Sequence, residues 1–270
     1  MKRTLLALGL AAIACSSFAY NAQLDGNFTY TDHDDNFTDT DHQFELKGTF
    51  YFSPVSTKNT PLNEAAFLGH NSNAYLGYSY NYLESKTILA TKSEADLHTI
   101  YGGIEYFVEQ FYLNGELGFG QSEIKVTSPL GNVTNESDVT NYRALVGYMP
   151  VSNLLLAAGI DGYQGDGDLE DNRFAVRAKY VAPMDQGQFL NLEADGAFGD
   201  TDSLTLGADY YFDQAFSLGA AYNIEDNGED DLDFFSIRSK YFINSNFAIG
   251  GAVGFGDDVQ AFNINATYRF

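Results

Sequence analysis

Cysteine, positive charge and long apolar runs are all scarce in this 270-residue chain. The chain has one cysteine, and its 14 lysines and arginines face 37 acidic residues, which argues against nucleic acid as a partner. Beyond the N-terminus, no apolar run approaches the ~20 residues that a membrane helix needs. Strong acidity often means disorder, but a chain with 44% apolar and 15% aromatic residues can bury a core. These absences leave two classes: a large soluble β protein, or a β-barrel that spans a membrane.

The N-terminus has the three parts of a secretory signal: a basic start, an apolar stretch at 5–14 and a small-residue cleavage site. The apolar part is too short for a membrane helix. We therefore expect residues 1–19 to be a signal peptide and residues 20–270 to form the mature barrel, with no thiol and a net charge of −25. The alternative is a lipoprotein acylated at Cys15, but Ala12 stands where such sites usually carry leucine.

Alternation of apolar and polar residues runs through the whole mature chain. In 261–270 (AFNINATYRF), every second residue from Phe262 onward is apolar, and the residues between are polar. A period of two with one apolar face and one polar face is the strand pattern. Fourteen such segments occur, at 21–30, 43–52, 73–83, 97–107, 110–121, 140–149, 153–163, 172–182, 188–199, 203–212, 215–224, 233–242, 246–256 and 261–270.

The connections between these segments alternate in length. Tight turns are expected at 108–109, 151–152, 183–187, 213–214 and 243–245, and longer polar loops at 31–42, 84–96, 122–139, 164–171 and 225–232. Bacterial single-chain barrels have an even number of strands, short turns on the periplasmic side and longer loops outside. The sequence therefore predicts an all-β, transmembrane, antiparallel barrel of about 14 strands, with both termini in the periplasm.

A soluble β-sandwich also has alternating strands, but it buries its apolar faces against each other. Two features favour the barrel. The chain ends on an aromatic residue that also ends a strand, and aromatic residues recur where interfacial girdles belong. The strand-end aromatic residues are Tyr30, Phe52, Tyr82, Tyr106, Tyr148, Phe212, Tyr241 and Phe270.

The polar strand faces carry eight basic and eight acidic residues, so the predicted lumen is nearly neutral. The excess acidity lies in the outer connections, which hold 24 acidic residues and three lysines, a net charge of −21. We predict twelve of the lumen residues to line a pore: Lys47, Glu105, Glu116, Arg143, Arg173, Arg177, Lys179, Glu193, Asp195, Asp209, Arg238 and Lys240.

Within the lumen, bases are expected on the sixth, eighth and twelfth strands and carboxylates mainly on the fourth, fifth, ninth and tenth. Fourteen strands spaced ~4.8 Å apart and tilted ~40° form a cylinder roughly 28 Å across, too wide for side chains alone to fill. Two interpretations remain open. The charges line a water-filled constriction with a transverse field, or they pair as struts and close the lumen.

One stretch resembles the putative porin family of Gram-negative outer membranes. Its motif is a GTFYF strand at 48–52, a P-L-x-E-A-A-F-L segment at 61–68 and an aromatic strand at 74–82. The YNAQLDG start and the YRF end are also similar. About 40 residues carry a specific motif, although the resemblance in architecture covers the mature chain. The resemblance implies a β-barrel for passive diffusion and does not identify the solute.

The segment 53–71 is the longest connection in the chain, although its position makes it a periplasmic turn. Pro61 can begin a helical turn, and residues 62–68 are too apolar for a solvated loop. Three placements are open: a partial plug in the barrel mouth, a contact with a partner at the membrane surface, or a short helix that caps the rim.

No catalytic, metal or cofactor site is expected. A barrel hydrolase needs serine, histidine and a carboxylate or amide within reach of one another. His98 is the one strand histidine, and its parity places it with Ile100 on the lipid side. The acidic loops lack the frame of a calcium-binding loop and are typical of solvated turns.

We expect an outer-membrane porin that passes small hydrophilic solutes and ions, with a modest preference for cations and without enzyme activity. The alternative is a recognition or adhesion barrel with a closed lumen. Expected partners are outer-membrane lipid and lipopolysaccharide, the solutes themselves, and further copies of the chain if the barrel forms oligomers. Nucleic acid is not among them.

Overall fold

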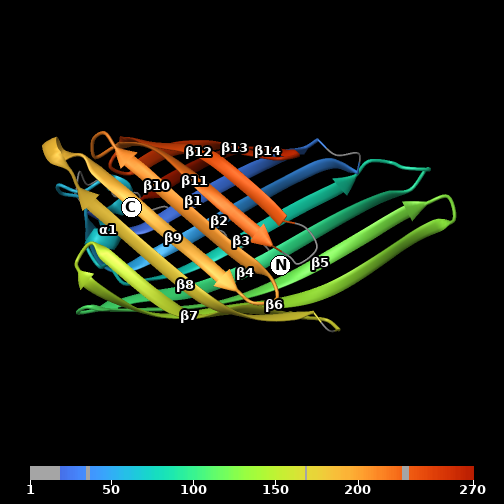
Figure 1. The fold of residues 1–270 in the computed structure, drawn as a ribbon, viewed down its shortest axis with the longest axis horizontal. Coiled ribbons are helices and arrows are strands. Elements are labelled where there is room, and N and C mark those ends of the chain that lie inside the picture. Colours follow the sequence, from blue (N-terminus) through green and yellow to red (C-terminus); the bar gives the residue numbers. More distant parts are fainter. Residues whose placement is uncertain (1–18, 35–36, 168, 227–230) are drawn as a thin grey trace, which may run out of the picture.

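The computed structural model describes residues 19–34, 37–167, 169–226 and 231–270. Its strands form a closed antiparallel barrel (Figure 1). The strands are β1 (Ala19–His33), β2 (Thr38–Ser56), β3 (Asn73–Ser85), β4 (Lys92–Val108), β5 (Phe111–Ser128), β6 (Gly131–Val151), β7 (Leu154–Gly165), β8 (Glu170–Pro183), β9 (Phe189–Phe198), β10 (Asp202–Tyr211), β11 (Phe216–Asp226), β12 (Asp231–Asn244), β13 (Phe247–Gly256) and β14 (Val259–Arg269).

Each strand pairs with its neighbours in the sequence, and β1 pairs with β14 to close the barrel. The closing ladder runs from Gln23 opposite Arg269 to His33 opposite Val259. Every predicted strand segment coincides with one of the fourteen strands and extends beyond it by at most one residue at either end, so the predicted fold class is confirmed. None of the helices in the described part of the chain is long and apolar enough to cross a membrane.

The two faces of the strands have opposite character over the barrel proper. Large apolar side chains such as Leu76, Leu117 and Ile264 are between 55% and 68% exposed on the outside. Sequence neighbours of these residues, such as Glu116 and Asn265, carry polar groups and point inward, because side chains alternate across a strand. This arrangement is the reverse of a soluble sandwich and places apolar surface where lipid would lie.

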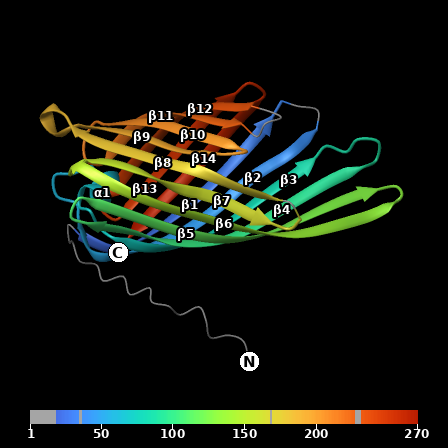
Figure 2. The same ribbon diagram turned by 60° about the horizontal axis from the view of Figure 1, so that its bottom comes forward.

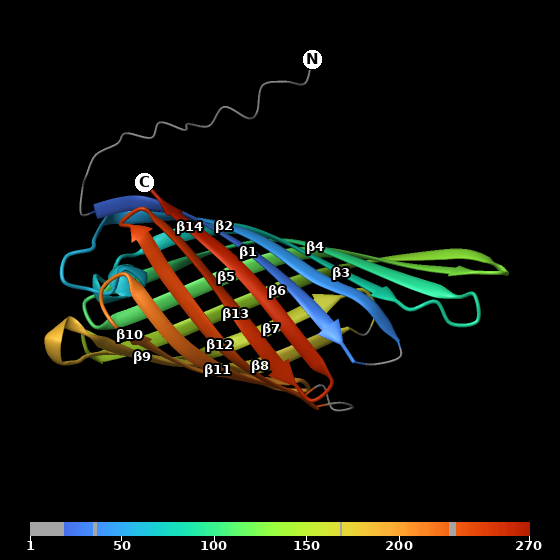
Figure 3. The same ribbon diagram turned by 90° about the horizontal axis from the view of Figure 1, so that it is seen from above.

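The β3–β4 and β5–β6 hairpins project past the other strands at one end of the barrel, here called the hairpin end (Figures 1 and 3). Strands β4, β5 and β6 span 17, 18 and 21 residues. The loops predicted at 84–96 and 122–139 are therefore wrong over most of their length. The β4–β5 ladder extends to Lys92 opposite Thr127, and the β5–β6 ladder extends to Ser128 opposite Gly131. Residues 122–139 thus form a hairpin continuous with the barrel wall. Parts of the loops predicted at 31–42, 164–171 and 225–232 lie outside the described residues.

The error has a physical origin in β5, where the polarity of the two faces inverts. Up to Phe119 the outward residues are apolar, whereas beyond it they include Glu123 and Lys125. On the inward face, Ile124 and Val126 replace the polar residues found lower in the strand. Polar outward residues show that this part of the strand meets water, so the inversion marks where the apolar belt ends.

The opposite end of the barrel is here called the terminal end, because β1 begins there and β14 ends there (Figures 2 and 3). The same end holds the short turns and the segment between β2 and β3. That segment contains the helical turn η1 (Leu62–Glu64) and the short helix α1 (Ala65–Leu68). A further turn, η2 (Asp185–Gly187), joins β8 to β9. The predicted signal peptide at 1–19 lies almost entirely outside the described residues.

Candidate functional site: the lumen and its plug

Three cavities, here called cavities 1, 2 and 3, lie among the inward side chains and have volumes of about 440, 390 and 470 Å³ respectively. Cavities 1 and 2 share Glu64 and Lys179, and cavities 2 and 3 share Glu45. All twelve residues predicted to line a pore line one of these cavities. Cavity 1 holds Glu105, Arg177, Lys179, Glu193 and Asp195; cavity 2 holds Asp209, Arg238 and Lys240, with Lys179 and Glu193 again; cavity 3 holds Lys47, Glu116, Arg143 and Arg173.

Most of the basic residues on β6 and β8 form ion pairs with carboxylates on nearby strands. Arg143 lies 2.7 Å from Asp195 and 3.6 Å from Asp161, and Arg173 also pairs with Asp161. Arg177 donates from Nε to Asp195 at 2.7 Å and from a terminal nitrogen to the Tyr112 hydroxyl at 3.0 Å. These contacts join adjacent strands, such as β7 and β8 through Asp161 and Arg173, and also strands that are not neighbours, such as β6 and β9 through Arg143 and Asp195.

A second group of charges joins β9, β10 and β12. Arg238 reaches Glu193 at 2.5 Å and Asp209 at 2.7 Å, and Asn191 donates to Asp209 at 3.0 Å. The charges predicted on separate strands are therefore brought together in clusters of opposite sign. Of the two arrangements that the sequence left open for these charges, direct pairing is the one seen at Arg143, Arg177 and Arg238.

The remaining residues of the predicted set have other partners. The Lys47 ammonium lies 4.3 Å from the centre of the Tyr75 ring. Lys240 lines cavity 2 and forms no ion pair within the described part of the chain. Glu116 and Glu105 each accept a hydrogen bond from a tyrosine hydroxyl, at 2.6 Å from Tyr75 and Tyr112 respectively.

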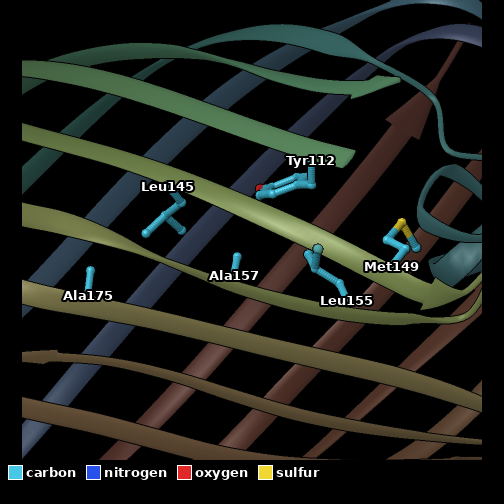
Figure 4. Packing of buried hydrophobic residues seen from close by; sticks show 6 residues of the cluster. All are labelled: Tyr112, Leu145, Met149, Leu155, Ala157 and Ala175. Atoms are coloured by element: carbon cyan, nitrogen blue, oxygen red, sulfur yellow. The ribbon is translucent and has the colours of Figure 1, made fainter. Parts of the chain in front are cut away.

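The segment between β2 and β3 enters the barrel mouth at the terminal end, and residues 57–71 are here called the plug. Its apolar side chains reach three separate parts of the inner wall. Leu62 packs with Phe242 and Ala248, and Ala65 packs with a cluster on β1 and β2. Phe67 packs against the cluster of Tyr112, Leu145, Met149, Leu155, Ala157 and Ala175 on β5 to β8, which Figure 4 shows.

Polar contacts hold the plug between these apolar anchors. Glu64 is buried, lies 2.8 Å from the Lys179 ammonium and accepts a hydrogen bond at 2.5 Å from the Tyr211 hydroxyl. Arg269 donates to the Leu62 carbonyl at 2.9 Å. Burial alone would raise the pKa of Glu64, but the Lys179 ammonium and the two hydrogen bonds outweigh it and lower the pKa below its ordinary value.

Of the three placements that the sequence left open for 53–71, the structure shows the partial plug, because the segment packs inside the barrel mouth. Sequence reasoning missed Glu64 as a lumen residue, although it lies in the apolar stretch that suggested a plug. It also missed the tyrosines that hold the glutamates, Tyr75, Tyr101 and Tyr112. The alternation of faces along β3, β4 and β5 places these tyrosines on the inward side, and that pattern could have identified them from the sequence.

The structure also shows where the histidines considered as catalytic or metal-binding candidates lie. His98 lies on the outward face, with its ring 4.7 Å from that of Tyr80. Within the described ranges, no group of three or more histidine, cysteine or acidic residues is arranged to hold a metal ion. His33 contacts Asp41 at 2.8 Å.

A closed barrel with an apolar outer belt and a polar, cavity-lined lumen defines the class of outer-membrane channel proteins. The chain belongs to the family described as "Putative general bacterial porin", which matches residues 2–161 and 124–270. The resemblance seen in the sequence is thereby confirmed, as is the location in the bacterial outer membrane.

Solved structures share the fold at low sequence identity. The outer membrane protein Omp33 of Acinetobacter baumannii is 20% identical, with a TM-score of 0.61 over 94% of this chain and 99% of that one. A FadL homologue of Pseudomonas aeruginosa is 11% identical, with a TM-score of 0.60 over 93% and 90%. The TodX monoaromatic hydrocarbon channel, as a deletion mutant, is 10% identical, with a TM-score of 0.60 over 94% and 91%. No match is found among curated proteins.

Proposed function

We propose that this channel passes small hydrophilic solutes and ions by passive diffusion, without enzyme activity. The observation that carries the proposal is the series of three cavities inside the barrel, each lined by charged side chains, in which successive cavities share lining residues. Although the lumen charges pair with one another, the paired residues still line these cavities, so the pairing does not close them. Paired charges of opposite sign let small polar solutes pass without a strong barrier of either sign.

The orientation proposed is a periplasmic terminal end and a hairpin end outside the cell, with the outer belt in contact with lipid and lipopolysaccharide. The terminal end holds the short turns and both ends of the barrel chain, and in bacterial outer-membrane barrels the short turns lie on the periplasmic side, which supports this orientation. The acidic connections then lie at the outer mouth, where they would concentrate cations within about a Debye length, ~8 Å at physiological salt. The preference for cations should be modest, since the lumen charges nearly balance.

Ion conductance in planar bilayers tests the proposal. Purified protein should insert and give discrete current steps, and liposomes that contain it should admit small neutral solutes. A barrel that inserts, judged by its heat-dependent migration in gels, but carries no current and admits no solute would instead support the closed recognition barrel.

A further inference from the structure

Tyr101 and Tyr163 flank a shallow stretch of the inner wall. Tyr101 on β4 lies opposite Gly118 on β5, Gly118 lies opposite Asn141 on β6, and Asn141 lies opposite Tyr163 on β7. Residues opposite each other in adjacent strands share one face of the sheet. All four line cavity 3, so two aromatic rings stand on either side of a floor made by a glycine and an asparagine. This set is here called the Tyr101–Tyr163 site.

The Tyr101 ring is fixed against the wall. On its other side, Tyr101 lies opposite Gly77 of β3, and a Cβ atom on Gly77 would meet ring atoms of Tyr101 at 2.2–2.6 Å. The ring therefore covers Gly77, while its hydroxyl donates to Glu45. Only glycine leaves room for this arrangement, which holds one ring face to the wall and leaves the other toward cavity 3.

The neighbouring Tyr75 shows why Tyr101 is the ring available to a solute. Tyr75 lies opposite Gly103 and covers it in the same way, with its hydroxyl held by Glu116. However, the Lys47 ammonium lies 4.3 Å from the centre of the Tyr75 ring, and Tyr75 does not line cavity 3. The Arg173 guanidinium also lies over a face of the Tyr163 ring, but at 5.9 Å from its centre, and Tyr163 lines cavity 3.

The adjacent row of residues supplies polar groups along one edge of the site. It runs from Glu116 to Arg143, Asp161 and Arg173, each opposite the next. Arg143 and Arg173 both pair with Asp161, and Arg143 also pairs with Asp195, so both guanidinium groups already have carboxylate partners. An ionic solute would have to compete with these ion pairs. A neutral hydroxyl group can instead accept from guanidinium N–H groups and donate to remaining carboxylate lone pairs.

We propose that the Tyr101–Tyr163 site binds neutral saccharides as they pass through the channel. A pyranose ring has a flat face of C–H groups that stacks on an aromatic ring, and its edge carries hydroxyl groups for the polar row. A purely apolar solute would leave that row without hydrogen-bond partners, which is unfavourable. The inference rests on the proposed function, because the saccharide must reach cavity 3 through an open lumen.

The experiment measures ionic current through the channel in planar bilayers while maltotriose is added. A solute that binds in the lumen lowers the current, and the concentration for half reduction reports its affinity. Mannitol is the matched comparison, since it has hydroxyl groups but no ring face. We expect maltotriose to reduce the current at concentrations at least tenfold below those of mannitol.

Variants assign the effect to the site. Tyr101→Phe keeps the ring and should leave the half-reducing concentration within about twofold, whereas Tyr101→Leu and Tyr163→Leu should each raise it about five- to tenfold. Tyr80→Leu, on the outward face, is the control and should behave as the wild type. Because Tyr101 also covers Gly77, Tyr163→Leu provides an independent test if Tyr101→Leu does not assemble.

The outcomes separate this inference from the proposed function. An absence of current in the unmodified protein would overturn the proposed function itself. Normal current that maltotriose and mannitol reduce equally, or that maltotriose does not change, would overturn the saccharide site and leave the porin function standing. A maltotriose effect that survives both leucine substitutions would also overturn it.

Discussion

Arg177 shows how single residues brace the lumen wall. Its guanidinium joins Asp195, on the adjacent strand β9, to the Tyr112 hydroxyl on β5, so one side chain ties together strands that are not neighbours. Hydrogen bonds to charged groups contribute about 1.5–3 kcal/mol each when intact. The same side chain lines cavity 1, so a structural role and a role in the pore coexist at one position.

Replacing Arg177 should affect both roles. Arg177→Gln should lower the free energy of unfolding by roughly 1–3 kcal/mol, since Asp195 and Tyr112 lose a charged donor. It should also raise cation selectivity, because Asp195 is then neutralised by Arg143 alone. Thermal unfolding in detergent and reversal potentials measure the two effects. Lys240→Gln is the matched control, since Lys240 has no ion pair in the described structure and should change only selectivity. Loss of stability with unchanged selectivity would mean that Arg177 acts only as a brace.

The strand parity of β14 makes a second prediction at the scale of the residue. Ile264 is 68% exposed on the outer face, whereas its neighbour Asn265 lines cavity 2. Ile264→Arg should cost roughly 2–4 kcal/mol near the bilayer midplane and impair assembly. Asn265→Arg should assemble and reduce conductance. Equal assembly defects, measured by heat-dependent gel migration, would contradict the assignment of faces.

Among the structural elements, the plug has contacts that depend on a titratable residue, Glu64. The folded pKa of Glu64 lies below its ordinary value of 4.5, so its ion pair with Lys179 stabilises the docked plug at neutral pH. That contribution is complete above the ordinary pKa and is lost as the pH falls through the lowered one. Acid should therefore loosen the plug without unfolding the barrel.

Single-channel recording can test this role of Glu64. Conductance should rise as the pH is lowered below 4.5. Glu64→Gln should show the higher conductance already at neutral pH, with little further change in acid. Glu109→Gln, in the exposed β4–β5 turn at the same end, should keep the behaviour of the wild type. A Glu64→Gln channel with unchanged conductance and unchanged pH response would show that Glu64 does not control the opening.

The elements also show what could be predicted from the sequence. Alternation located all fourteen strands and their faces, because a barrel needs one lipid-compatible face on every strand. It failed where β5 leaves the apolar belt, since a solvated strand such as 122–128 has the composition of a loop. The plug contacts could not be predicted either. Glu64 meets Lys179 only because barrel closure brings β8 to the segment between β2 and β3.

At the scale of the whole molecule, charge is distributed unevenly along the barrel axis. The lumen charges nearly cancel, whereas the segments toward the hairpin end carry the excess of acidic residues. One acidic cluster is well placed to act on passing ions. Asp32 and Asp34 from the end of β1 and Asp257 and Asp258 from the β13–β14 turn line one hollow at the mouth.

This asymmetry predicts cation selectivity that weakens with salt, because screening shortens the reach of the mouth charges from ~10 Å at 0.1 M to ~3 Å at 1 M. Reversal potentials across a salt gradient should show modest cation preference at low ionic strength and almost none at 1 M.

Replacing the four aspartates at the mouth with asparagine should reduce the preference at low salt. Replacing Asp185 and Asp213, in turns at the terminal end, should reduce it less. The two sets differ in number, so the comparison is made per charge removed. Clear anion selectivity of the wild type at low salt would contradict the prediction, and so would equal effects per charge at the two ends.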